Sequence, residues 1–358
     1  MPKTEWLLAA PLSATNSKAD TPLYKFLARL MRGEDLSFDE SSEFFHALID
    51  KNASREQIAG ALVALTAKGE TAAELAGMAR VMRERAVPIS SRHKNFIDIT
   101  GTGSSAAKTF NVSTAAAFVA AGAGLAVAKQ SNRQVSSTSG SADVLEKLGV
   151  KVSAAPETVQ ACLNGAGLGF MYASKFHPAL QHVGEARGNL GIRSCLNLLG
   201  VLANPANAPQ QLVGVWHESL IKPMAQALAL LDTQRAWVVR GADGLDEITL
   251  SGETTVAEVA GKKMKLFKIS PKDFGLQAGK IEHLKIADAG ASAKIISEVF
   301  AGNRRDEARS LIIINAAAAL IIGGVARQPM QAARLAEQSI DSGQAQNKLE
   351  RLIQTTNK

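Results

Sequence analysis

The sequence predicts a small all-helical domain followed by a larger α/β domain with a mainly parallel central sheet. Two observations carry this prediction. Apolar residues repeat at helical spacing over residues 21–90, and beyond Pro88 the chain changes to short apolar runs, punctuated by glycine, that alternate with helical stretches. A length of 358 residues fits two domains of ordinary size.

Four helices are expected in the first domain, near 22–32, 38–50, 55–67 and 72–86. The last three follow a hydroxyl residue that stands three positions before Glu or Gln, which is the signature of a capping box. These pairs are Ser37 with Glu40, Ser54 with Gln57, and Thr71 with Glu74. Pro88 closes the last helix.

The strands of the second domain are expected at 96–100, 125–129, 150–152, 169–172, 213–215, 236–240 and 265–269. Between several of them lie helical stretches at 114–123, 141–148, 156–165 and 218–231. Strands joined by helical crossovers run parallel. We therefore expect the large domain to comprise 91–175 and 206–358.

The net charge of +7 is concentrated in one part of the chain. Residues 91–205 carry +5, whereas residues 1–90, 206–290 and 291–358 carry −1, 0 and +3. A nucleic-acid binder usually interleaves basic runs with aromatic residues, but here the basic residues are scattered singly and aromatics make up only 5%. The distribution favours a compact anionic ligand.

Several classes of protein are excluded by composition. The apolar runs 311–323 and 114–128 are shorter than the roughly 18 residues that a membrane span needs. Two cysteines, Cys162 and Cys195, form neither a disulfide framework nor a zinc cluster, so a reducing, cytoplasmic setting is expected. Pro11 interrupts the apolar segment near the N-terminus, and we expect residues 1–20 to form a flexible extension rather than a signal peptide.

The first segment with chemical character is 98–114, where a strand runs into a loop rich in glycine and hydroxyl groups and then into an Ala-rich helix. Gly101 and Gly103 allow backbone amides to approach a ligand, and the helix N-terminus adds unpaired N–H groups. Such a loop suits a phosphate or pyrophosphate, although a tight turn with a Ser/Thr helix cap would read the same way.

Three further segments follow the same logic. Residues 127–143 place Lys129 and Arg133 among short polar residues at the end of a strand, which is either a second anion site or a Ser-rich surface linker. Arg187 and Arg193 could bind a carboxylate or be two solvated arginines. The acids of 243–249 could hold magnesium or be ordinary surface acids.

Taken together and in this order, the four segments resemble the anthranilate phosphoribosyltransferase family of tryptophan biosynthesis. The likeness runs from about residue 23 to residue 352. It includes Lys68-Gly-Glu-Thr71, the stretches 109–113, 137–143 and 187–200, Asp273-Phe-Gly-Leu276 and Asn315-Ala-Ala-Ala-Ala-Leu320.

The resemblance implies an α/β fold of the nucleoside phosphorylase and phosphoribosyltransferase type. It implies a discontinuous helical domain made of 21–90 and about 176–205. The reaction it implies is transfer of a phosphoribosyl group from phosphoribosyl pyrophosphate to the amino group of anthranilate, with Mg²⁺ as cofactor. A homodimer formed through the helical domain is also implied. No membrane partner is expected, and the composition does not favour a nucleic-acid partner.

The resemblance also implies which residues of this chain form the site, because they match the family's functional positions. Those implied to bind phosphoribosyl pyrophosphate are Gly101, Thr102, Gly103, Ser104, Ser105, Thr109, Asn111, Ser113, Lys129 and Ser141. Those implied to bind anthranilate are Gly101, Asn132, His177 and Arg187. Ser113, Asp246 and Glu247 match the family's magnesium positions, and Arg187, Asp246 and Glu247 are the implied catalytic residues.

The chain departs from the family pattern in both loops. The family usually reads Gly-Thr-Gly-Gly-Asp where this chain has Ser104 and Ser105, and Lys-His-Gly-Asn-Arg where this chain has Gln130 and Ser131. The second departure bears on the affinity and specificity for anthranilate more than on phosphate binding. It leaves open a catalytically silent paralogue that binds nucleic acid, although such a protein has no need for Arg187 or the acid pair. A pyrimidine-nucleoside phosphorylase would likewise leave those residues unused.

Overall fold

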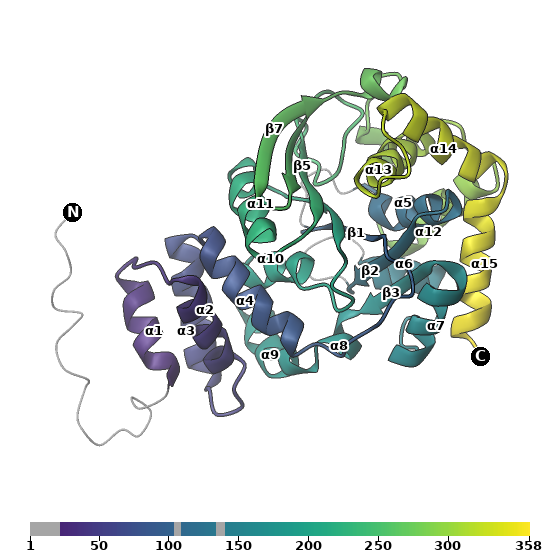
Figure 1. Ribbon diagram of the computed structural model, residues 1–358. Coiled ribbons are helices and arrows are strands. Elements are labelled where there is room, and N and C mark those ends of the chain that lie inside the picture. The colour runs from purple at the N-terminus through teal and green to yellow at the C-terminus, as the bar shows by residue number, and fades with distance from the viewer. Residues whose placement is uncertain (1–21, 104–108, 134–139) are drawn as a thin grey trace, which may run out of the picture.

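The computed structural model describes residues 22–103, 109–133 and 140–358 (Figure 1). The expected N-terminal extension, 1–20, lies outside these residues. The chain opens with four helices, α1 (Pro22–Met31), α2 (Phe38–Leu48), α3 (Arg55–Lys68) and α4 (Ala72–Glu84). All three predicted capping boxes are present at the starts of α2, α3 and α4, which confirms the sequence signals for these helices.

The large domain is built on one seven-stranded sheet with the order β3-β2-β1-β4-β5-β6-β7. Its strands are β1 (Phe96–Gly101), β2 (Ala126–Ser131), β3 (Leu168–Tyr172), β4 (Gln210–Gly214), β5 (Arg235–Gly241), β6 (Thr254–Ala260) and β7 (Lys263–Ile269). The first five strands pair in parallel, and β6 and β7 add an antiparallel hairpin at one edge. The prediction of a mainly parallel sheet is confirmed.

Two details of the strand prediction are wrong. Residues 150–152 form no strand, because this short stretch is the loop after α6 (Ser141–Lys147). Its two valines are buried in the core, and the Val150 N–H bonds back to the Leu145 carbonyl at 2.9 Å instead of to another strand. Strand β6 was not predicted, because its Ala and Glu residues have weak strand propensity. Pairing on both sides, with β5 and with β7, stabilises it instead.

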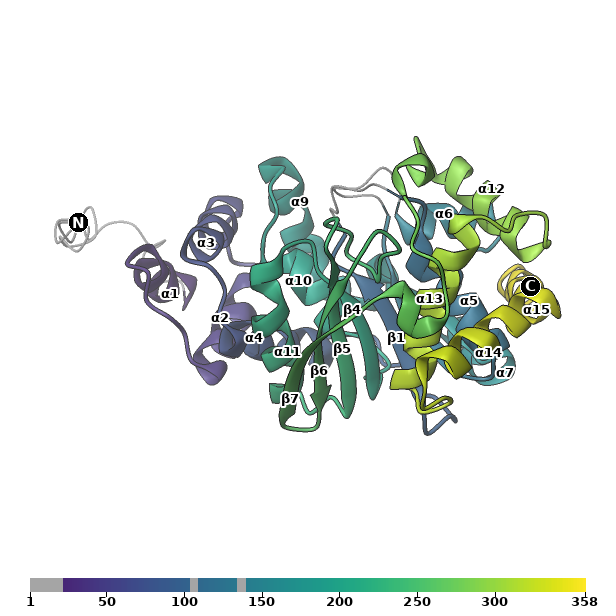
Figure 2. The same cartoon turned by 90° about the horizontal axis from the view of Figure 1, so that it is seen from above.

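Helices cover both faces of the sheet (Figure 2). The helices of the large domain are α5 (Val112–Gly122), α6 (Ser141–Lys147), α7 (Pro156–Ala166), α8 (Ala173–Phe176), α11 (Ile221–Leu230), α12 (Ala289–Phe300), α13 (Glu307–Ile322), α14 (Pro329–Asp341) and α15 (Gln344–Thr356). Figure 2 shows α5, α13 and α14 on one side of the sheet, and α11 with the N-terminal helices on the other. None of the helices in the described ranges is long and apolar enough to cross a membrane.

Two helices from the middle of the chain lie beside the N-terminal bundle (Figure 2). They are α9 (Gln181–Leu190) and α10 (Cys195–Leu202). Buried residues of both, among them Val183 and Leu199, share one hydrophobic cluster with the side chains of α1 to α4. The same cluster continues under α11 to the sheet, so the bundle is packed on the large domain through apolar contacts.

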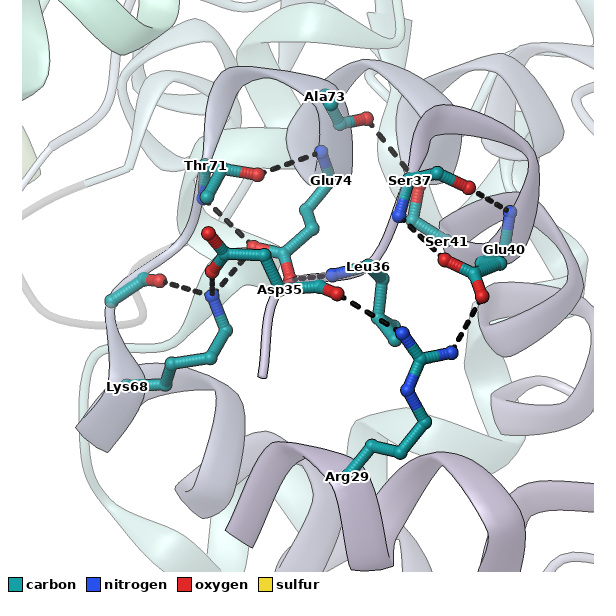
Figure 3. A network of polar contacts seen from close by, with 11 residues as sticks. Arg29, Asp35, Leu36, Ser37, Glu40, Ser41, Lys68, Thr71, Ala73 and Glu74 are labelled. Carbon is teal, nitrogen blue, oxygen red and sulfur yellow. Dashed lines mark hydrogen bonds and ion pairs between the residues drawn. The ribbon is translucent and has the colours of Figure 1, made fainter. Parts of the chain in front are cut away.

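The segment Lys68-Gly-Glu-Thr71 organises the turn between α3 and α4 (Figure 3). The buried carboxylate of Glu74 accepts hydrogen bonds from Lys68 Nζ at 2.9 Å, from the Thr71 backbone N–H at 2.8 Å and from the Leu36 N–H at 2.9 Å. Lys68 Nζ also donates to Asp35 at 2.7 Å. Since a buried carboxylate must be fully paired, this network fixes the turn and joins it to the start of α2.

Candidate active site

The residues singled out by the sequence gather at the carboxyl ends of the central strands. The strand order reverses direction between β1 and β4, where the chain leaves β1 toward one side of the sheet and β4 toward the other. Ligands of open α/β sheets bind in the crevice at this point. Gly101 at the end of β1 lies opposite Gly214 at the end of β4.

The first loop leaves β1 through a backbone turn that only glycine adopts easily. Gly103 has a φ of 70°, in the left-handed region. Thr102 is buried and tied to β4, because its N–H donates to the Gly214 carbonyl at 2.9 Å and its hydroxyl accepts from the Trp216 N–H at 3.2 Å. Ser104 and Ser105 lie outside the described residues.

Beyond this gap the chain enters α5. Thr109 forms an isolated bridge with Lys285. Asn111 is the helix N-cap, and its side chain accepts from the Thr114 N–H at 3.3 Å and from the Thr114 hydroxyl at 2.5 Å. Its own N–H donates to Ser292 at 2.9 Å, which anchors the helix start to α12.

The acid pair, Asp246 and Glu247, lies against the loop that follows β1, although Asp246 is 143 positions beyond Gly103 in the sequence. The Gly103 N–H donates to the Asp246 carboxylate at 2.9 Å. A side chain at Gly101 would place its Cβ 2.7 Å from the same carboxylate, and one at Gly214 would lie 1.6 Å from the Asp246 carbonyl oxygen. Both strand ends must therefore be glycine for the acid loop to approach this closely.

The charges of the acid pair are poorly compensated by the protein. Burial raises the pKa of Asp246, and burial together with the neighbouring Asp246 charge raises the pKa of Glu247 to about 8. Ser113, near the start of α5, is within hydrogen-bonding reach of Glu247 through its hydroxyl and its N–H. Two adjacent carboxylates and a hydroxyl are oxygen ligands, so these residues fit a magnesium ion.

Lys129 is the cation nearest this pair on β2. Its side chain is buried, its Nζ donates to the Ile99 carbonyl, and the same atom lies 3.2 Å from Ser113 Oγ. Burial lowers the pKa of Lys129, while Asp98, Glu247 and Asp246 oppose that shift. A buried lysine surrounded by three acids stabilises them and is held in its place by them.

Sequence reasoning missed Asp98, which looked like an ordinary polar residue of a strand. Its carboxylate is buried and accepts from Thr100 Oγ1 at 2.5 Å and from Asn204 Nδ2 at 2.7 Å. Burial raises the pKa of this carboxyl. An acidic residue inside an apolar strand was the available signal, because such a residue must find buried partners.

Asn315 has a supporting role that its motif alone did not reveal. Its side-chain oxygen accepts from the Ile248 N–H and its Nδ2 donates to the Ile248 carbonyl, both at 2.9 Å. Ile248 directly follows Glu247, so a buried residue of α13 fixes the backbone of the acid loop. Asp243 closes the other side of the loop by accepting from Thr249 Oγ1 at 2.5 Å.

Only the two flanks of the second loop are described. The Asn132 N–H donates to Ser141 Oγ at 3.1 Å, which joins the end of β2 to the start of α6. Arg133, expected to be a second cation for an anion, pairs instead with Asp143 at 3.0 Å and with Glu146 at 2.7 Å. Lys129 is therefore the cation that this segment directs toward the acid pair.

Arg187 and Arg193 have different surroundings. Arg187, on α9, is half-buried, and its Nε has no hydrogen-bond partner among the described residues. Burial lowers the pKa of this guanidinium. Arg193 is exposed and lies over the Trp216 ring at 5.3 Å. A half-buried guanidinium with an unused donor suits an anionic ligand.

His177 follows α8 and is buried, and its ring lies against the backbones of Met82 and Ala203. Burial lowers its pKa to about 4, so the imidazole is neutral at physiological pH. It can therefore donate or accept a hydrogen bond, but it does not supply a positive charge.

Family models match most of the chain. The helical bundle domain of a glycosyl transferase family matches residues 24–86, and the a/b domain of that family matches residues 93–346. An anthranilate phosphoribosyltransferase of Rubrobacter xylanophilus is 44% identical over 93% of this chain and 97% of its own length. One from Roseiflexus castenholzii is 45% identical, with coverages of 93% and 98%.

Solved structures agree in fold. Anthranilate phosphoribosyltransferase from Thermus thermophilus superimposes with a TM-score of 0.87 at 37% identity and covers 93% of this chain and 99% of its own. The enzyme from Saccharomyces cerevisiae, in complex with PRPP and Mg, gives 0.86 at 26% identity, with coverages of 96% and 99%.

Proposed function

The chain belongs to the anthranilate phosphoribosyltransferase family, and on this premise we propose how its residues divide the work of the reaction. It is a glycosyltransferase that transfers the phosphoribosyl group of phosphoribosyl pyrophosphate to the amino group of anthranilate, giving N-(5-phosphoribosyl)anthranilate and pyrophosphate. The relatives support this activity and not the nucleic-acid-binding alternative. The observation that supports the division of roles is the buried acid pair held against the glycine loop.

The chemistry requires that the ribose–pyrophosphate bond be largely broken before attack, because the amino group of an aromatic amine is a weak nucleophile. Stabilising the departing pyrophosphate is then the main catalytic task. Asp246, Glu247 and Ser113 hold Mg²⁺, which when bound neutralises the leaving group. Gly101, Gly103 and the start of α5 border the pyrophosphate, and Lys129 lies beside them, with its Nζ 3.2 Å from Ser113 Oγ.

The acceptor lies on the other side of the ribose. Arg187 faces the anthranilate carboxylate with its unused Nε donor, and Asn132, Gly101 and His177 border the same ligand. With these roles the reaction needs no dedicated general acid or base, because positioning the amine and stabilising the leaving group account for the rate acceleration. The neutral imidazole of His177 fits that scheme.

The two domains form the site together. We assign α9 and α10 to the helical domain because their buried side chains belong to its hydrophobic cluster. Arg187 on α9 then belongs to one domain, while Asp246, Glu247 and Lys129 belong to the other. Closure of the helical domain over the sheet brings acceptor and donor together and excludes water, whose attack would hydrolyse the donor.

The surface of the helical domain supports the homodimer. A groove of about 540 Å³ between α1 and α3 is lined by Leu27, Leu30, Met31 and Val63, among others. Met31 and Val63 are 54% and 43% exposed, which is unusual for large apolar side chains on neighbouring helices. A second copy of the chain covers this groove. The compartment in which the enzyme acts is the cytoplasm. Met31→Glu with Val63→Glu should give a monomer in analytical ultracentrifugation where the unaltered chain is a dimer.

The activity is tested with the purified chain, phosphoribosyl pyrophosphate and anthranilate. Anthranilate fluorescence should fall over time with MgCl₂ present and stay constant in EDTA. Constant fluorescence with MgCl₂, together with retention on DNA that weakens as salt rises, would contradict this function and support the silent paralogue.

A further inference from the structure

A buried serine of α12 holds the start of α5 from a distant part of the chain. The Asn111 N–H donates to Ser292 Oγ at 2.9 Å, although the two residues are 181 positions apart in the sequence. Ser292 is fully buried in the first turn of α12, which Asp288 caps, and both of its neighbours in sequence are alanines. Burying a hydroxyl costs free energy unless it is paired, so packing alone would favour another alanine here. The contact with Asn111 explains the hydroxyl.

This contact matters because the start of α5 has already used its backbone donors. The Val112 N–H donates to a neighbouring carbonyl at 2.8 Å, and the Thr114 N–H donates to Asn111 Oδ1 at 3.3 Å. The Ser113 N–H is within hydrogen-bonding reach of Glu247. The expectation that this helix start adds unpaired N–H groups is therefore wrong for these residues. A ligand at this end of α5 must be bound by side chains instead.

The Asn111 side chain presents a donor that the described residues do not use. Its Oδ1 accepts from both the N–H and the hydroxyl of Thr114, at 3.3 Å and 2.5 Å. Because a carboxamide is planar, Nδ2 lies on the opposite side of the group, where it has no hydrogen-bond partner in the described part of the chain. Thr114 thus orients the Asn111 side chain, and Ser292 fixes its backbone.

The chain just before α12 also holds the chain just before α5. Thr109 forms an antiparallel bridge with Lys285, which directly follows the 3-10 helix η5 (Glu282–Leu284). Leu284 is buried in one hydrophobic cluster with Phe110. Backbone, apolar and hydrogen-bond contacts from one segment therefore fasten the entry to α5.

Resting on the proposed function, in which the start of α5 borders the pyrophosphate, we propose that Ser292 is a positioning residue for the donor. By fixing the Asn111 backbone, it keeps Nδ2 where this atom donates to an oxygen of the pyrophosphate group. Ser113, a magnesium ligand in the proposed function, is two residues further along the same helix start. Ser292 itself does not touch the donor, because it is fully buried and its hydroxyl already accepts from Asn111.

The test is Ser292→Ala, which removes the hydroxyl and leaves the rest of the side chain. Isothermal titration with pyrophosphate in MgCl₂ should show a dissociation constant raised about fivefold, the effect of losing one hydrogen bond of average strength. The KM for phosphoribosyl pyrophosphate should rise with it. The KM for anthranilate should stay close to that of the unaltered enzyme.

Ser339→Ala is the matched control. Ser339 is a buried serine of α14 whose hydroxyl donates to the Val119 carbonyl at 2.8 Å, toward the other end of α5. Both substitutions therefore remove one buried hydrogen bond between a C-terminal helix and α5. The melting temperature of the ligand-free protein should fall by a similar amount in both, whereas only Ser292→Ala should weaken the binding of pyrophosphate.

Asn111→Ser tests whether Ser292 acts through Asn111. Serine keeps an oxygen that can cap α5 but has no Nδ2, so pyrophosphate binding should weaken while the helix start persists. Adding Ser292→Ala to this variant should then change the dissociation constant by less than about twofold, because both substitutions remove the same contact with the ligand.

Equal dissociation constants for pyrophosphate in the unaltered chain and in Ser292→Ala would overturn the proposal, and so would additive effects of Ser292→Ala and Asn111→Ser. Equally weakened binding in Ser292→Ala and Ser339→Ala would also overturn it, since that would show a general loosening of α5. The predicted pattern of pyrophosphate binding in a chain that does not consume anthranilate would count against the proposed function alone. No pyrophosphate binding by the unaltered chain would overturn both.

Discussion

Replacing Glu247 by Gln tests whether the acid pair lowers the stability of the metal-free folded protein and whether a bound cation restores that stability. Burial and the Asp246 charge raise the pKa of Glu247 to about 8, against an ordinary value of 4.5. The folded protein therefore holds this proton more tightly than the unfolded chain does. The stability that the group contributes is full below about pH 4.5 and is lost as the pH rises toward about pH 8.

The size of the effect follows from the shift. One pKa unit corresponds to about 1.4 kcal/mol. At pH 7 the unfolded chain has ionised Glu247 while the folded protein still holds the proton, so the metal-free protein has lost roughly 3 kcal/mol of the stability that it has below pH 4.5. The neutral glutamine avoids this loss. The free energy of unfolding of Glu247→Gln should exceed that of the unaltered chain by roughly this amount at pH 7, and the two should nearly coincide at pH 4.5.

Urea unfolding of both proteins in EDTA at pH 4.5 and pH 7 measures this difference, and the titrating groups that do not interact with Glu247 cancel because both proteins contain them. Adding MgCl₂ and pyrophosphate should then stabilise the unaltered chain and have little effect on the variant. A variant that is less stable at pH 7, or whose difference is the same at both pH values, would refute the reasoning.

Three other predictions concern the acceptor, the glycine at the end of β4 and the buried histidine. Arg187→Ala should raise the KM for anthranilate far more than that for phosphoribosyl pyrophosphate, and equal effects in steady-state assays would argue against its role. Gly214→Ala should lower the free energy of unfolding by about 1–3 kcal/mol and reduce turnover, because its Cβ would overlap the Asp246 carbonyl. Gly165→Ala, in open space on α7, should be neutral or stabilising in the same denaturation assay. Since the pKa of His177 is about 4 in the folded protein, its contribution to stability is full above about pH 6.5 and lost as the pH falls toward 4. His177→Phe should reduce that acid-induced loss by roughly 3 kcal/mol in unfolding measured between pH 6.5 and pH 4.

The helical domain could be predicted in detail because its signals are local. Each capping box occupies four consecutive residues, and the boxes at Ser37, Ser54 and Thr71 begin the helices that the sequence indicated. Strand β6 was missed because it depends on neighbours at both sides, and residues 150–152 were misread because three alternating residues are too few to distinguish a strand from a buried loop.

The sequence motifs of the site could be predicted, but the contacts between them could not. The contact from Gly103 to Asp246 and the one from Asn315 to Ile248 join segments far apart in the chain, and nothing local in the sequence encodes them. Arg133 was given a role in the site that the structure does not support. Its position suggested an anion site, yet the acids that pair with it lie on the next helix, at Asp143 and Glu146. Gln130 is buried because both faces of β2 are covered, which follows from the fold alone.

The central claim is that the acid pair at the carboxyl ends of β1 and β4 holds the magnesium that the departing pyrophosphate needs. The most direct test is turnover by the double variant Asp246→Asn with Glu247→Gln, followed as loss of anthranilate fluorescence with MgCl₂ and phosphoribosyl pyrophosphate. Circular dichroism and melting should show an intact fold, because amides replace two poorly compensated charges. We predict no measurable turnover in this folded variant. Turnover equal to that of the unaltered enzyme would contradict the account.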